Sequence, residues 1–347
     1  MKVLALAADH GGCGFYRMRA PASEVAKLGV DIEVADGVNA EAVRHPDGRV
    51  DVLELHTDAD LIVVQRPLDH SMTGIIEQAH RQGIATVVEI DDDFSTVHTQ
   101  NIAHDAMIGD LTGNHWVEKA CLIADHVTVS TPQLTKYARH GRVSILRNNV
   151  PDDIFKTSGA RNFNEPRIGW TGSVQTHPDD LQQTKRAVAD VLMTNGLNFN
   201  VIGDGQYVAS NLSLDKSTSV FATGWVPIEE YYEALSQHLD IGIVPLELSP
   251  FNEAKSALKG LEYAAIGIPF VASPTREYLR MEAYGIGKTA KSPGEWRKHL
   301  QRMIDRTSET ERLANEARDR IEAEHTYSVN APQWIEAWEK AIAYRKT

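Results

Sequence analysis

The sequence has little cysteine, no excess of positive charge and no long hydrophobic run. Cys13 and Cys121 are the only cysteines among 347 residues, which argues against a disulfide or zinc framework and leads us to expect a reducing, cytoplasmic location. No apolar run approaches the roughly 18 residues that a membrane-spanning helix requires. The apolar stretch in the opening MKVLALAADHGG is too short for a secretory signal, so we expect a first β-strand there. The net charge of −13 argues against broad nonspecific binding to nucleic acid or anionic membranes.

Strand and helix patterns alternate along the whole chain, which favours an α/β fold with parallel sheets. A chain of 347 residues is long enough for two domains. A polar stretch with Gly and Asn, residues 157–166, is predicted to link them. The predicted strands are 2–7, 31–35, 61–65, 85–90, 126–130, 143–146, 167–170, 198–202, 219–222 and 241–244. The predicted helices are 16–28, 73–82, 116–124, 132–138, 179–194, 228–235, 308–323 and 329–345.

Residues 249–273, SPFNEAKSALKGLEYAAIGIPFVAS, predict a loop, one helix, a tight turn and a buried strand. Ser249 followed by Pro250, or alternatively Asn252, can begin the helix. Gly267 can end it, and Pro269 prevents its continuation.

One face of this predicted helix is polar. Ser256, Lys259 and Glu262 follow at i, i+3 and i+6 and span roughly 9 Å. A hydroxyl, a cation and a carboxylate in this order, near a helix N-terminus, suit a diphosphate followed by a ribose. Lys259 would neutralise the phosphates, and Glu262 would accept hydrogen bonds from sugar hydroxyls. The alternative is a solvated helix face with ordinary charges.

The same segment resembles the C-terminal signature of retaining, family-4-like nucleotide-sugar glycosyltransferases with the GT-B fold. Their signature K-x-x-E-Y-x-A-x-G-x-P-V-V-A stands here as KGLEYAAIGIPFVA, beginning at Lys259. The resemblance implies two Rossmann-like domains with a cleft between them: an acceptor domain over residues 1–156 and a donor domain over 165–327. A C-terminal helix, 328–347, would cross back to the first domain.

The resemblance also implies a nucleoside-diphosphate sugar as donor substrate, with UDP or GDP as the nucleotide, and neither a cofactor nor a metal. Lys259, Glu262 and Asp91 are the candidate catalytic residues. Small-residue loops after the strands would line the cleft, although the first of them is also compatible with a plain turn, and it lacks the G-x-G-x-x-G order of a dinucleotide site. The remaining donor-binding candidates are Gly12, Gly14, Gly172, Ser173, Gly203, Gly205, Val226 and Ser256.

Other positions depart from the resembled family. Many relatives carry an Arg and a Lys after the loop at Gly172, but residues 174–181 contain neither. Ala254 stands where retaining relatives usually have the first of two glutamates, which leaves the donor sugar and the stereochemistry open. Trp225, next to Val226, is predicted to be either a base contact or a core residue.

Asp91-x-Asp93 imitates the D-x-D metal motif of the other large glycosyltransferase fold. Because GT-B enzymes generally use Lys and helix dipoles in place of Mg²⁺, we favour acceptor binding or a structural cap over a metal site. Arg17, Asp92 and His98 are the acceptor-side candidates, with Arg17 equally compatible with a surface position.

The leading hypothesis is a glycosyltransferase that acts, with retention, on a hydroxyl of a saccharide, a protein, a small metabolite or a modified nucleic-acid base. The alternatives are a nucleotide-sugar epimerase, a noncatalytic nucleotide-sugar-binding protein and a Rossmann dehydrogenase.

Overall fold

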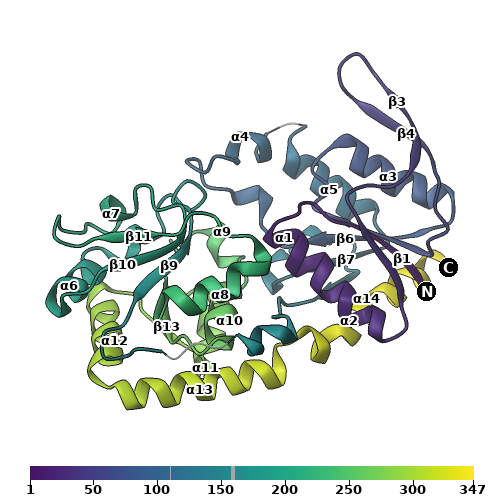
Figure 1. Ribbon diagram of the computed structural model, residues 1–347. Coiled ribbons are helices and arrows are strands. Elements are labelled where there is room, and N and C mark those ends of the chain that lie inside the picture. The colour runs from purple at the N-terminus through teal and green to yellow at the C-terminus, as the bar shows by residue number, and fades with distance from the viewer. Residues whose placement is uncertain (110, 158–160) are drawn as a thin grey trace.

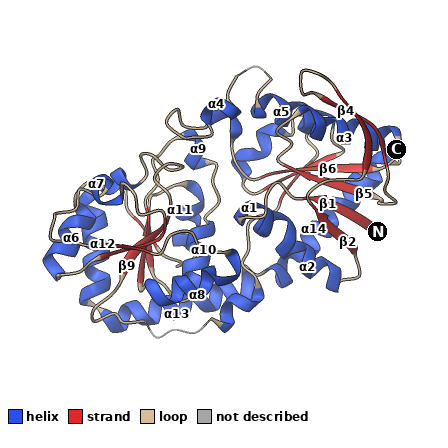
Figure 2. Ribbon diagram, turned by 45° about the horizontal axis from the view of Figure 1, so that its top comes forward, coloured by secondary structure: helices blue, strands red, loops and turns tan. Residues whose placement is uncertain are grey.

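The chain forms two α/β domains, each built around a six-stranded parallel sheet with helices on both faces (Figures 1 and 2). The computed structural model describes residues 1–109, 111–157 and 161–347. Part of the predicted linker 157–166, namely residues 158–160, therefore lies outside the described residues. The predicted fold class, two Rossmann-like domains, is confirmed.

The first domain has the strand order β2-β1-β5-β6-β7-β8. Leu6 at the end of β1 aligns with Ala35 on one side and with Val64 on the other, so these three strands end within one residue of one another. The order reverses between β1 and β5, and ligands of open α/β sheets bind outside the carboxyl ends of strands at such a point. The strands are β1 (Lys2–Leu6), β2 (Asp31–Ala35), β5 (Leu61–Gln65), β6 (Ala85–Ile90), β7 (His126–Val129) and β8 (Val143–Ile145).

The helical segments of the first domain begin with a continuous run after β1, in which a π-helical turn separates two α-helical pieces. The run starts at Gly12, four residues before the predicted helix start. The segments are α1 (Gly12–Gly14), the π-turn η1 (Phe15–Arg19), α2 (Ala20–Lys27), α3 (His70–Arg81), η2 (Phe94–Thr96), α4 (His104–Met107), α5 (Gly113–Ile123), η3 (Pro132–Tyr137) and η4 (Asp152–Lys156).

A two-stranded antiparallel hairpin, β3 (Ala40–Arg44) and β4 (Val50–Leu55), projects from this domain and was not predicted (Figure 1). Its signal was present in the sequence: two β-compatible runs flank Pro46-Asp47-Gly48, a turn sequence.

The second domain has the order β11-β10-β9-β12-β13-β14, in which the third, second, first, fourth, fifth and sixth strands lie side by side. This is the strand order of the dinucleotide-binding fold, and it reverses between β9 and β12. The strands are β9 (Ile168–Gly172), β10 (Phe199–Gly203), β11 (Val220–Ala222), β12 (Ile241–Val244), β13 (Phe270–Ala272) and β14 (Lys288–Thr289). The helices are η5 (Leu181–Thr184), α6 (Ala187–Asn195), α7 (Val208–Asn211), α8 (Ile228–His238), α9 (Pro250–Glu253), α10 (Leu258–Ala265), α11 (Arg276–Ala283), α12 (Pro293–Asp305) and α13 (Thr307–Glu324).

The last helix, α14 (Tyr327–Arg345), returns to the first domain, so both chain ends lie there (Figure 1). Its apolar row, Trp334, Trp338 and Ala341, is buried against the first domain, and Arg345 forms an ion pair with Asp125, the residue before β7. The predicted crossing helix is confirmed. Because α14 joins the two domains a second time, it restricts how far they can separate.

Candidate active site

A cavity of about 680 Å³ opens between the two domains, at the carboxyl ends of the central strands of both sheets. This volume lies within the range of small-molecule sites in proteins. We call it the cleft. The first domain contributes the loop after β1, residues of η1, and Asp91. The second domain contributes the ends of β9 and β10, the loop before α8, and one face of α10.

The loop after β1 is held in a tight turn by its own side chains. The Asp9 carboxylate accepts a hydrogen bond from the Gly14 amide at 3.0 Å, and the Arg19 guanidinium donates to the Asp9 carbonyl. A Cβ at Gly14 would lie 2.0 Å from that carbonyl, so only glycine fits. Gly12 lines the cleft and Gly14 does not. Gly14 therefore shapes the loop, whereas Gly12 is placed to approach a ligand.

The loops after β9 and β10 approach each other closely at the cleft wall. Gly203 has a φ of 123°, and a Cβ there would lie 2.4 Å from the Gly172 carbonyl oxygen. Gly172, Ser173 and Gly203 line the cleft, but Gly205 lies outside it. This part of the predicted donor site is assembled except for Gly205.

The prediction of a single helix, capped by Ser249 or Asn252 and ended by Gly267, is wrong: two helices, α9 and α10, replace it. Ser249 caps α9, accepting a hydrogen bond from the Asn252 amide. Between the helices, the Ala254 carbonyl accepts a hydrogen bond of 2.7 Å from the Thr131 hydroxyl of the first domain. Lys255 reaches Asp92 of the first domain at 3.5 Å. Because of these contacts across the domain interface, the segment between α9 and α10 does not form part of one continuous helix.

Ser256 is consequently not on the helix that carries Lys259 and Glu262. Its hydroxyl accepts a hydrogen bond of 2.8 Å from the side-chain amide of Asn148, and it does not line the cleft. The predicted three-residue row on α10 is reduced to Lys259 and Glu262.

Lys259 lies in the cleft wall with its ammonium 5.6 Å from the centre of the Trp170 ring. Burial, followed by the nearby Lys255 ammonium, lowers the pKa of Lys259 to about 8. In the described part of the chain Lys259 has no ion-pair partner within 4 Å. Its charge is therefore available to an anion that enters the cleft.

Glu262 is 3% exposed, and its carboxylate accepts hydrogen bonds from residues of both domains. Tyr16 of the first domain donates a hydrogen bond to its carboxylate, and Tyr231 of the second donates another at 3.2 Å. The Tyr16 hydroxyl also meets that of Tyr232 at 2.7 Å. Burial raises the pKa of Glu262 to about 7. Tyr16 and Tyr231 line the cleft and were missed by the sequence analysis, because neither belongs to a spacing that identifies a site.

Residues 174–181 contain no Lys or Arg. The residue of this segment that has a basic side chain is His177, which lines the cleft. Its Nδ1 lies 2.8 Å from the Asp180 carboxylate, which also accepts hydrogen bonds from Asn252 and from the Glu247 amide. Burial, followed by the Lys259 charge, lowers the pKa of His177 to about 4. The Asp180 bond fixes the orientation of a largely neutral imidazole in the cleft wall.

The acidic run after β6 is neutralised by cations. Arg66 forms ion pairs with Asp91 and, at 2.7 Å, with Asp92. Asp93 caps η2 through the Ser95 amide and pairs with Lys136 at 2.7 Å. The cap interpretation is thus correct for Asp93. Asp91 faces the cleft, whereas Asp92 does not line it.

Arg17 is not a surface arginine: it is 1% exposed. Its Nε donates to Glu89 at 2.7 Å, and its Nη1 donates to the Leu146 carbonyl and the Asn148 side chain. Arg17 therefore borders the cleft with the charge of its guanidinium already paired. Trp225, by contrast, is 74% exposed at the cleft, so the core interpretation of this residue is wrong.

The structure thus brings together most, but not all, of the predicted site. His98 lies outside the cleft, in a smaller neighbouring cavity. The predicted residues that line the cleft are Gly12, Arg17, Asp91, Gly172, Ser173, Gly203, Val226, Lys259 and Glu262, and those that do not are Gly14, Asp92, His98, Gly205 and Ser256.

Comparison with known proteins agrees with this geometry. Residues 182–336 match a family model described as glycosyl transferase-like. No curated protein sequence matches the chain.

Solved structures resemble it over nearly its full length. Sucrose-phosphate synthase from Thermosynechococcus elongatus has a TM-score of 0.62 at 14% identity, covering 99% of this chain and 100% of that one. HepE from Anabaena in complex with UDP-glucose has a TM-score of 0.66 at 15% identity, covering 98% and 99%. UDP-GlcNAc 2-epimerase from Neisseria meningitidis, bound to UDP-GlcNAc, has a TM-score of 0.56 at 12% identity, covering 98% and 100%.

The chain therefore has the GT-B fold, with a glycosyl transferase-like segment that contains α10. These findings support an enzyme of the glycosyltransferase class. None of the helices formed by the described residues combines the length and apolar character needed to cross a bilayer.

Proposed function

We propose that this protein transfers a glycosyl group, with retention, from a nucleoside-diphosphate sugar to an acceptor hydroxyl. The observation that carries the proposal is the placement of Lys259 and Glu262 one turn apart on α10, both facing the cleft beside the loop at Gly172. A cation and a carboxylate at this separation fit a diphosphate and the ribose next to it. The acceptor would lie on the opposite wall, near Asp91.

In this proposal the main catalytic effect is stabilisation of the departing diphosphate. The bond between the anomeric carbon and the phosphate oxygen breaks, and the electron pair leaves with the nucleoside diphosphate. Lys259 and the first-turn N–H groups of α10 stabilise the charge that develops there. The acceptor oxygen bonds to the anomeric carbon from the same face, and its proton passes to the departing phosphate. Holding donor and acceptor in one cleft supplies the positioning.

Lys259 takes the place of a catalytic metal in this scheme, and no cofactor is proposed. Glu262 would exchange one of its tyrosine hydrogen bonds for a ribose hydroxyl when the donor binds. UDP is the proposed nucleotide, because HepE, whose fold this chain shares, binds UDP-glucose.

The binding of UDP is expected to weaken above pH 8. The diphosphate needs the Lys259 ammonium, and the pKa of Lys259 in the free protein is about 8. Below pH 8 Lys259 already carries its proton before UDP binds. Above pH 8 Lys259 must take up a proton when UDP binds, so the affinity for UDP falls by about tenfold per pH unit. Calorimetry from about pH 7 to about pH 9.5 measures this slope, since the phosphates are ionised throughout.

The matched control for the pH profile is Lys259→Arg. A guanidinium stays charged over this range, so the affinity of this variant should not change with pH. An equal slope in both proteins would show that another group titrates.

Replacing Trp225 with alanine is expected to weaken UDP binding by about 1–3 kcal/mol, the usual contribution of stacking between a base and an aromatic ring. The indole is exposed at the cleft and is free to stack. Tyr284→Ala is the control, because Tyr284 is 58% exposed at the end of α11 and does not line the cleft. Equal affinities for Trp225→Ala and the unmodified protein would remove Trp225 from the base site.

The proposed function is tested first by thermal stabilisation with UDP-, GDP-, ADP- and TDP-sugars, with NAD as a control and with and without EDTA. Stabilisation by one nucleotide series in the presence of EDTA, followed by acceptor-dependent release of that nucleotide, is the expected result. NMR of the product anomer then tests retention. Release of free UDP and a sugar epimer without an acceptor would identify an epimerase, and stabilisation by NAD alone would contradict the proposal.

A further inference from the structure

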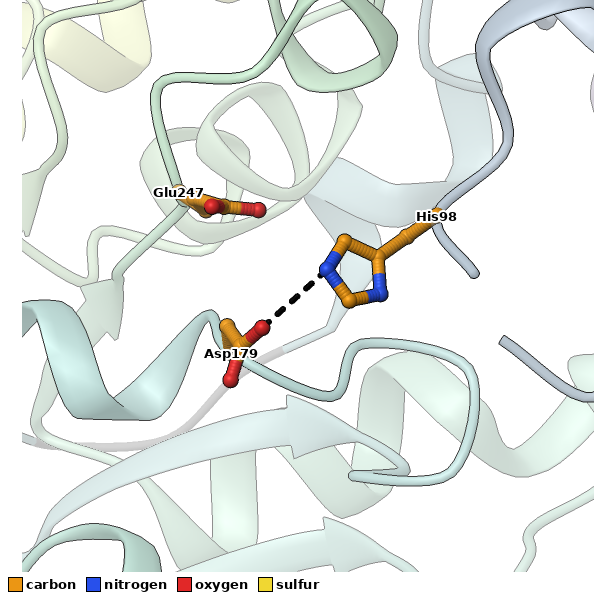
Figure 3. A group of neighbouring side chains, drawn as sticks. All are labelled: His98, Asp179 and Glu247. Carbon is orange, nitrogen blue, oxygen red and sulfur yellow. Dashed lines mark ion pairs between the residues drawn. The ribbon is translucent and has the colours of Figure 1, made fainter. Parts of the chain in front are cut away.

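A second, much smaller cavity lies between the two domains beside the cleft. Its volume is about 10 Å³, which suits one water molecule or a bare metal ion and excludes an organic ligand. His98, from the loop after η2 in the first domain, faces Asp179 and Glu247 of the second domain across it (Figure 3). One ligand atom from each of the three lies within 4.8 Å of the others.

The charges in this cavity are not balanced by the side chains around it. The Asp179 carboxylate lies 3.2 Å from His98 Nε2. Glu247 has no ion-pair partner within 4 Å among the residues that the structure describes. Asp180 and His177 also line the cavity and bond to each other at 2.8 Å. Asp179 and Glu247 are left with the His98 imidazole, which even when protonated would neutralise only one of them.

Asn252 provides an independent observation at the same cavity. Its side chain is 5% exposed, and its amide nitrogen donates to Asp180 at 2.8 Å and to the Glu247 carbonyl at 3.1 Å. Its Oδ1 is buried and has no hydrogen-bond partner in the described parts of the chain. Because a buried acceptor without a partner is costly, it points to a ligand that accepts electron pairs. A cation would satisfy this oxygen and neutralise the carboxylates together.

We propose that His98, Asp179, Glu247 and Asn252 bind one divalent transition-metal ion that joins the two domains. An imidazole with two carboxylates is a ligand set for Zn²⁺, and the imidazole disfavours Mg²⁺ and Ca²⁺. The ion stabilises the contact at which the Asn101 side chain already donates to the Thr176 carbonyl. The site lies outside the cleft, so the ion holds the domain arrangement and takes no part in the transfer chemistry. The inference does not depend on the proposed function.

The test is a Zn²⁺ titration of the full chain after removal of metals with a chelator. Competition with a chromophoric chelator and calorimetry should show one ion bound per chain, and the melting temperature should rise when the ion is present. His98→Ala and Glu247→Gln should each lower the affinity at least about tenfold. His104→Ala is the matched control, because His104 belongs to the same connection but lies on α4, paired with Asp105, and it should bind as the unmodified chain does.

Two results would overturn the proposal. The first is no Zn²⁺ uptake and no change in melting temperature, which would leave a His98–Asp179 ion pair with a water molecule. The second is equal affinity in the unmodified chain and the Glu247→Gln variant, which would place the ion elsewhere. Glu247→Gln preserves the shape of the side chain, so it decides the question even if His98→Ala fails to fold.

Discussion

Replacing Lys259 with alanine is expected to lower kcat about 100-fold or more, while the protein stays folded. The expectation rests on the proposed function, in which Lys259 stabilises the charge of the departing diphosphate. Loss of one such group typically costs on the order of 3 kcal/mol in the transition state. In the free protein the ammonium is held in the cleft wall without an ion-pair partner among the described residues, and burial already lowers its pKa to about 8. Its removal should therefore leave the melting temperature unchanged or slightly higher.

The measurement is steady-state kinetics with the donor and acceptor identified by the binding and turnover experiments. Lys136→Ala serves as the control, because Lys136 forms an ion pair with Asp93 and does not line the cleft. Lys259→Arg should keep part of the activity, since its charge remains but its shape differs. A Lys259→Ala protein with full kcat would exclude the assignment of this residue and with it the proposed mechanism.

Replacing Arg17 with methionine is expected to lower the free energy of unfolding by about 3–5 kcal/mol, the usual effect of removing one partner of a buried ion pair. The Arg17 guanidinium and the Glu89 carboxylate are 1% and 2% exposed and lie 2.7 Å apart. Without the guanidinium, Glu89 keeps only the Thr128 hydroxyl as a side-chain partner in the part of the chain that the structure describes. A carboxylate buried in this way must either stay charged at high cost or take up a proton.

The loss should grow with pH, and the sign follows from the pKa of Glu89. Burial raises this pKa to about 7 even in the presence of Arg17, against about 4.5 in the unfolded chain. Between these values the folded protein binds more protons than the unfolded one, so stability falls as pH rises. Without Arg17 the pKa of Glu89 should rise further, and the fall should continue above pH 7.

Urea unfolding at about pH 5 and about pH 8 measures both effects. The double variant Arg17→Met with Glu89→Gln removes both charges of this pair, and much of the stability should return. A single variant Arg17→Met as stable as the unmodified protein at pH 8 would mean that this pair contributes nothing to the fold.

Elements with a purely local signal were predicted well. The predicted strands 31–35, 61–65, 85–90 and 241–244 have the same bounds in the structure. Three of them, 61–65, 85–90 and 241–244, are apolar runs buried along their whole length, and a parallel strand buried on both faces needs no further information to be recognised. The fourth, 31–35, is an edge strand in which acidic and apolar residues alternate. Lys259 and Glu262 belong to the same category, because their spacing within one helix places both on one face whatever surrounds it.

Features that depend on distant partners were predicted poorly. Ser256 was assigned to the helix of Lys259, but Thr131 and Asp92 of the first domain hold that segment in another conformation. For Arg17 the sequence left a surface position open. In the structure Arg17 is buried and pairs with Glu89, which lies 72 residues away in the sequence.

By itself, then, the sequence determined the alternation of strands and helices, the two parallel sheets and the signature on α10, because each follows from periodicity and turn chemistry within a short window. Only the tertiary structure decided which side chains meet between the domains: Tyr16 with Glu262, and His98 with Asp179. Those pairs join positions 246 and 81 residues apart. Their contact depends on how the two sheets are placed by α14 and the interface, and no local pattern carries that information.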